Sequence, residues 1–111
     1  MVTGLSTKAA AMRADAVAQL GKVPEHLRAG LLRYLDDGIE PGHFLQALLD
    51  NNLREAIGRT GAGIELDDLR HLVRMLENDW PADAKGSNGE RVAWQKAGGL
   101  NGQYCRKELA A

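Results

Sequence analysis

The sequence predicts one all-α domain over residues 1–111, a compact bundle of four to five short helices. Aliphatic residues recur at three- and four-residue steps in several segments, which is the spacing of one helical face. Aromatic residues make up only 5% of the chain, so its core must be mainly aliphatic, which suits packed helices better than a sheet. Short connections with glycine or proline separate the segments and favour antiparallel neighbours.

The first two helices are predicted over residues 6–20 and 24–36. The first belongs to an alanine-rich segment, 1–22, whose thin apolar face buries little area alone. We therefore expect it to pack across a neighbour or against a second copy of the chain. Pro24 suits the first turn of the second helix, and Gly38 suits the left-handed residue that ends it.

The third helix is predicted over residues 41–57 and is placed at the centre of the core, because its apolar pattern is the clearest in the chain. A fourth helix is predicted over 65–78, with acidic residues at its start that favour the helix dipole. The residues expected to face inward are Phe44, Leu45, Leu48, Leu49, Leu53, Ala56 and Ile57 in the third helix and Leu66, Leu69, Leu72, Val73 and Leu76 in the fourth.

After Pro81, which ends the fourth helix, Ser87 and Glu90 have the spacing of a capping box. A short helix through Trp94 is predicted to follow and to end at Gly98. The C-terminal segment 100–111 is expected either to be mobile or to dock through its apolar residues, which are Leu100, Tyr104 and Leu109.

Charge and cysteine content exclude several classes of protein. Fourteen basic and fifteen acidic residues are interspersed and give a net charge of −1, unlike the basic footprint of a general nucleic-acid binder. The single cysteine, Cys105, cannot form an intrachain disulfide. The sequence has no basic segment followed by an apolar run at its start and no apolar stretch near the ~20 residues that cross a bilayer. These observations predict a cytoplasmic protein.

No catalytic or metal site is predicted, and no cofactor. Cys105 has neighbouring cationic residues but no histidine nearby in sequence to act as a base, which indicates an incidental thiol. Asp68 and His71 have a carboxylate–imidazole spacing, as do Glu40 and His43. The second pair encloses Pro-Gly, and both histidines lie among charged residues, so solvated histidines are expected rather than metal ligands.

A helix-turn-helix is a further interpretation of segments 24–36 and 41–57. The outward positions of the second segment include Asp50 and Glu55, whose carboxylates repel phosphate, while only Arg54 offers a strong contact to DNA. A dimeric DNA-binding regulator is therefore the weakest functional hypothesis.

The candidate binding site consists of two glycine-containing turns that each lead into a helix. Small residues there let an anion approach the unpaired amides of the helix start. The aromatic ring of Trp94 and the ammonium of Lys85 could add stacking and charge, although ordinary capping with Trp94 in the core is the alternative. The predicted ligand-binding residues are Gly42, His43, Lys85, Gly86, Ser87, Asn88 and Trp94, with Arg28 and Arg33 as charge partners.

Residues about 23–99 also carry a resemblance. Its markers are Tyr34, Gly38-Ile39, Pro41-Gly42, Phe44-Leu45, Leu48-Leu49, Asn51, Leu53, Ala56, Pro81, Gly86-Ser87 and Trp94. This pattern is similar to a family of small uncharacterised proteins encoded by bacteriophages and prophages, and the chain departs from it at Asn52 and at 60–62. The resemblance implies an accessory protein that binds a host protein or sequesters a signalling nucleotide in the host cytoplasm.

Together these observations predict a non-catalytic, self-associating binding protein that counters a host defence. In the leading hypothesis it sequesters a small anionic, nucleotide-like ligand at helix N-termini. In the alternative hypothesis it inhibits a host protein through an exposed helical face that includes the first helix.

Overall fold

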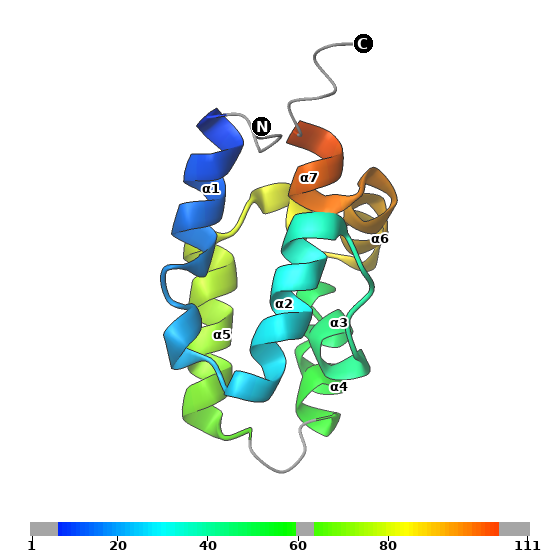
Figure 1. Ribbon diagram of the computed structural model, residues 1–111. Coiled ribbons are helices and arrows are strands. Elements are labelled where there is room, and N and C mark those ends of the chain that lie inside the picture. The colour runs from blue at the N-terminus through cyan, green and yellow to red at the C-terminus, as the bar shows by residue number, and fades with distance from the viewer. Residues whose placement is uncertain (1–6, 60–63, 105–111) are drawn as a thin grey trace.

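The structure is a computed structural model that describes residues 7–59 and 64–104, and these residues form a small all-α bundle (Figure 1). The prediction of fold class is confirmed. The described part holds seven α-helices rather than four or five, because the predicted third helix is divided and a further helix follows Gly98. The helices are α1 (Thr7–Val17), α2 (Glu25–Asp37), α3 (His43–Leu49), α4 (Leu53–Gly58), α5 (Leu66–Asp79), α6 (Asn88–Ala97) and α7 (Gly99–Tyr104), with 3-10 turns η1 (Leu20–Lys22) and η2 (Ala82–Ala84).

Helices that are distant in sequence pack side by side in an elongated molecule of 45 × 27 × 21 Å. α1 contacts α5, and α2 contacts α7. The guanidinium of Arg13 in α1 donates two hydrogen bonds, of 2.7 and 3.0 Å, to the carboxylate of Asp36 in α2. Ala9 and Ala16 of α1 are fully buried, so the thin apolar face of this helix is covered inside the chain.

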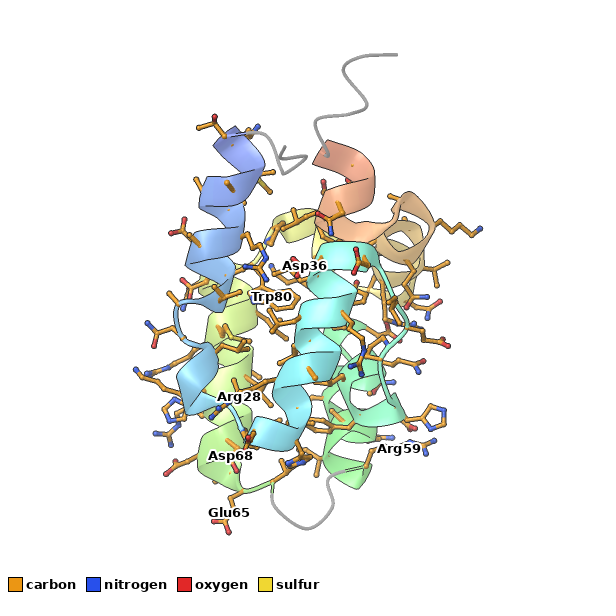
Figure 2. All side chains as sticks on the ribbon, viewed as in Figure 1. Arg28, Asp36, Arg59, Glu65, Asp68 and Trp80 are labelled. Atoms are coloured by element: carbon orange, nitrogen blue, oxygen red, sulfur yellow. The ribbon has the colours of Figure 1, made fainter. Side chains whose placement is uncertain are left out.

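Tyr34 lies at the centre of the core and joins several elements. Its ring lies 6.4 Å from those of Trp80 and Trp94, and its hydroxyl donates a hydrogen bond of 2.6 Å to the backbone oxygen of Ala84. Trp80 also donates from its indole nitrogen to the backbone oxygen of Ala16 at 3.0 Å, which connects the end of α5 to α1 (Figure 2). Three of the five aromatic residues of the chain therefore meet in the core.

The prediction of one continuous third helix over 41–57 is wrong, because the structure has two helices there, α3 and α4. The chain leaves the helix after Leu49, Asn51 adopts a left-handed φ of 62°, and the side chain of Asn52 accepts a hydrogen bond from the first turn of α4. α4 is thus a separate, short helix. Leu53 and Ile57, both expected to face inward, are 54% and 51% exposed.

The fourth predicted helix corresponds to α5, but two of its residues also differ from expectation. Leu69, Leu72 and Leu76 are buried as predicted, whereas Leu66 and Val73 are 74% and 37% exposed. α5 therefore presents an apolar edge to solvent beside α4.

The predicted end signals of α2 and α6 are confirmed. Gly38 ends α2 with a φ of 69°, and the hydroxyl of Ser87 accepts a hydrogen bond of 3.2 Å from the amide of Glu90 at the start of α6. The tail prediction is confirmed for Leu100, which is fully buried in α7. Cys105 and Leu109 lie outside the described residues.

Candidate functional site

The two glycine-containing turns lie at opposite ends of α3 and do not form one site. Gly42 is the N-cap of α3, whereas the amide of Gly86 donates a hydrogen bond of 2.9 Å to the backbone oxygen of Leu49, the last residue of that helix. A helix of seven residues is about 10 Å long. A single small anion cannot contact both turns.

Several polar groups of the second turn have partners inside the protein. The Gly86 amide is bound to Leu49, and the Ser87 hydroxyl caps α6. The side-chain nitrogen of Asn88 donates a hydrogen bond of 3.3 Å to a carboxylate oxygen of Asp50. These groups hold α6 against α3, so the Gly86 amide and the side chains of Ser87 and Asn88 already have partners inside the protein.

Trp94 is a core residue and not a stacking platform. Only 2% of the residue is exposed, and its indole nitrogen donates a hydrogen bond of 2.9 Å to the backbone oxygen of Tyr34. Its ring is therefore not open for the predicted stacking, although Trp94 borders a hollow together with Glu90 and Gln103.

The remaining predicted residues are dispersed. Arg28 donates to the backbone oxygens of Val23 and Gly21, at 2.9 and 3.0 Å, and so holds the connection between η1 and α2. Arg33 is exposed on α2, and His43 is exposed at the first turn of α3. Neither arginine lies at either glycine-containing turn as a charge partner in the contacts of the described residues.

Two predicted residues, Lys85 and Gly86, do line a cavity, of about 150 Å³. Its walls are the apolar side chains of α3, α4 and α5, and its polar groups come from the α3–α4 connection and from Glu77. The Lys85 ammonium lies 3.9 Å from a carboxylate oxygen of Glu77, and its side chain is largely buried. The other lining residues are Leu48, Asn51, Asn52, Leu53, Val73 and Leu76.

This cavity is one end of a longer depression between α4 and α5. A second hollow shares Leu53 and Val73 with the cavity, and a third shares Leu66 and Leu69 with the second. We call the three together the α4–α5 groove. The second hollow is lined by Leu53, Leu66, Leu69, Arg70, Val73 and Arg74. The third hollow is lined by Ile57, Ile64, Glu65, Leu66 and Leu69.

The groove gathers most of the exposed large apolar side chains of residues 7–59 and 64–104. Leu53, Ile57, Leu66 and Val73 all line it, whereas the fifth such residue, Ile39, does not. Single exposed apolar residues are common on proteins, but a contiguous group indicates a binding surface.

Charged groups alternate along the α5 side of the groove. Glu65 and Asp68 lie at the start of α5 (Figure 2), and the side chain of Asp68 accepts a hydrogen bond of 2.9 Å from the amide of Glu65. Arg70 and Arg74 line the middle, and Glu77 and Lys85 the far end. The arrangement offers apolar contact area flanked by charges of both signs, and such charges orient a bound chain.

A buried ion pair supports the connection between α3 and α4. Arg91 in α6 donates a hydrogen bond of 2.6 Å to Asp50, the C-cap of α3, and one of 2.7 Å to Gln95. The Arg91 guanidinium also lies 3.7 Å from a carboxylate oxygen of Glu40. Sequence reasoning missed this role and placed Asp50 on an outward face.

The described residues contain no group of three or more histidine, cysteine or acidic side chains that could hold a metal ion. In the same part of the chain, no helix is long and apolar enough to cross a membrane.

Comparisons of the chain with protein-family models, with curated proteins and with solved structures gave no match. The phage-family resemblance therefore stays a prediction.

Proposed function

We propose that the protein is a non-catalytic binding protein and that the α4–α5 groove is its binding surface for another protein. The observation that carries the proposal is the contiguity of Leu53, Ile57, Leu66 and Val73 along three adjoining hollows. Burying apolar area of this kind is the main source of affinity in most protein associations.

The dimensions of the groove favour a helical segment of the partner. From Leu66 to Glu77 the groove follows about 16 Å of α5, the length of three helical turns. An amphipathic helix with apolar residues at positions i, i+4 and i+7 would place one anchor in each hollow. The partner we propose is therefore a protein that offers such a helix.

The phage-family resemblance gives this binding a setting, in which the partner is a host protein and its inhibition counters a defence. The sequence-based hypothesis included the first helix in the inhibitory face. Ala9 and Ala16 of that helix are fully buried within the chain. The groove replaces α1 as the proposed surface.

A nuclear magnetic resonance titration tests the proposal. The probe is a synthetic amphipathic helical peptide of zero net charge with leucines at i, i+4 and i+7. We expect its addition to shift the amide signals of α4 and α5 in the wild type, and to have much less effect on Leu53→Glu. Ile39→Glu is the matched control, since Ile39 is a similarly exposed apolar residue that does not line the groove. Equal binding by both variants, or shifts confined to other helices, would contradict the proposal.

A second candidate is capture of a small anionic, nucleotide-like ligand in the cavity at the Lys85 end of the groove. One observation favours it: apolar walls, two asparagines and a lysine converge on a space of about 150 Å³. A cavity of that size holds roughly one aromatic ring. The phosphate would remain at the mouth of the cavity and would replace Glu77 as the ion-pair partner of the Lys85 ammonium.

Thermal unfolding separates this candidate from protein binding. Mononucleotides, cyclic dinucleotides and nicotinamide-derived nucleotides are the probes, and a ligand that binds only the native state raises the melting temperature. The rise should disappear in Lys85→Ala and remain in Lys96→Ala, whose lysine is exposed on α6 and does not line the cavity. No rise with any probe at millimolar concentration rejects the candidate.

No observation favours the DNA-binding hypothesis. Its recognition helix over 41–57 is divided, and Asp50, placed on its outward face, is ion-paired with Arg91.

A further inference from the structure

The α4–α5 groove is complementary to itself, and we propose that two copies of the chain pair through it in an antiparallel, two-fold symmetric dimer. This inference rests on the proposed function, since it requires the groove to be a protein-binding surface. It adds the identity of one partner and a way in which the surface is covered when no other protein is bound.

Shape complementarity comes from Leu66 and Val73. They line the same hollow and lie two helical turns apart on α5, about 10 Å. Leu66 is the most exposed large apolar residue of the described chain, and Val73 also borders the deeper cavity. A two-fold axis between Leu69 and Arg70 places Leu66 of one copy against the partner's Val73, and symmetry repeats the contact.

Charge complementarity follows from the same axis. Asp67 of one copy then comes within one turn of the partner's Arg70 on the same flank of the paired helices, and symmetry repeats the contact. Within one copy the Arg70 guanidinium already lies 4.0 Å from the carboxylate of Asp67, and both side chains are well exposed. Arg70 can therefore pair with Asp67 of either copy. The antiparallel register is the one we propose because it brings these opposite charges together.

The dimer would act on the proposed function by competition. Pairing covers the apolar side chains of both copies, so another protein must displace one copy to reach the groove. Partner binding would therefore weaken as the concentration of the protein rises, because the fraction of copies with an open groove falls.

Sedimentation velocity on the full chain tests the pairing. We expect the wild type to shift from monomer to dimer as its concentration rises, and Leu66→Glu to need at least tenfold higher concentration. Leu66 is so exposed that the variant should fold, and circular dichroism with thermal unfolding checks this. Ile39→Glu, the matched control, should dimerise like the wild type.

A charge exchange tests the register. Arg70→Glu alone places a glutamate against the partner's Asp67 at each contact, and Asp67→Arg alone places an arginine against the partner's Arg70. Each variant should self-associate roughly five- to tenfold more weakly than the wild type, from two reversed surface pairs. Mixed in equal amounts, the two variants should form a heterodimer of near wild-type affinity, because opposite charges meet again at both contacts.

Three results would overturn the inference. If the wild type stays monomeric up to about 1 mM, the chain does not dimerise through the groove with measurable affinity. A dimer that persists in Leu66→Glu uses another face, and failure of the mixed charge variants to associate rejects the register. Binding of the helical probe peptide to a strictly monomeric wild type would refute the pairing alone and leave the proposed function standing.

Discussion

The indole nitrogen of Trp94 donates a hydrogen bond of 2.9 Å to the backbone oxygen of Tyr34, sixty positions earlier in the chain. Tyr34 in turn donates from its hydroxyl to the backbone oxygen of Ala84. These two bonds hold α6 and η2 against α2, and they place Lys85, the next residue after η2, at the edge of the α4–α5 groove. The core thus positions one end of the proposed binding surface.

Replacing the central tyrosine tests this support. In Tyr34→Phe the buried backbone oxygen of Ala84 loses the hydrogen bond from the Tyr34 hydroxyl, which should lower the free energy of unfolding by about 1–3 kcal/mol. Urea denaturation of the variant and the wild type measures the difference. A change below about 0.3 kcal/mol would mean that the bond contributes nothing measurable.

Tyr34 also predicts a loss of stability at alkaline pH. Burial raises the pKa of its phenol, Arg91 partly offsets that rise and Asp50 adds to it. Because the folded pKa lies above the unfolded value of about 10, the stabilisation is present in full below that pH and is lost as the pH rises further. Stability should fall by up to about 1.4 kcal/mol per pH unit above pH 10, and less steeply in Tyr34→Phe. Equal slopes in the two proteins would show that Tyr34 is not responsible.

The ion pair between Arg91 and Asp50 should be costly to break. Asp50→Asn removes the charge that accepts from a buried guanidinium, and we expect a loss of about 3 kcal/mol in unfolding free energy. Arg59→Ala is the control, because the Arg59–Glu55 pair is exposed and such pairs contribute about 0.5 kcal/mol or less. Similar losses in both variants would contradict the distinction between buried and exposed pairs.

The left-handed residue between α3 and α4 predicts an unusual order of substitutions. Asn51→Gly should be close to neutral, since glycine adopts a positive φ without steric cost, whereas Asn51→Ala should lower stability by about 1 kcal/mol. Thermal or urea unfolding gives the order directly. If alanine were tolerated better than glycine, the connection would be helical in solution and α3 and α4 would be one helix.

Local signals in the sequence were sufficient to predict the ends of several helices. Gly38 and the Ser87–Glu90 pair specify backbone geometry within a few residues, and the structure has them as expected. The spacing of apolar residues was misleading at 41–57, because Leu53 and Ile57 keep the helical period although the helix axis changes between them and Leu49. A signal was present: Asn52 with Glu55 three residues later has the form of a helix start.

The candidate site was predictable only in part. The turn at Lys85 and Gly86 was recognised, and both residues line the cavity. Leu53 and Val73 were assigned to the core, since their spacing fits an inward face as well as a groove. The bond from Trp94 to Tyr34 and the pair of Arg91 with Asp50 join residues far apart in sequence, and nothing local indicates such partners.

Whether the α4–α5 groove binds protein can be decided from a single ratio of peptide affinities. Fluorescence anisotropy of the labelled neutral helical peptide gives its dissociation constant for the double variant Leu53→Glu/Leu66→Glu and for Ile39→Glu. We predict that the dissociation constant is at least tenfold higher for the double variant than for the wild type. For Ile39→Glu we predict the wild-type value. Equal constants for the two proteins, with both of them folded, would contradict the claim.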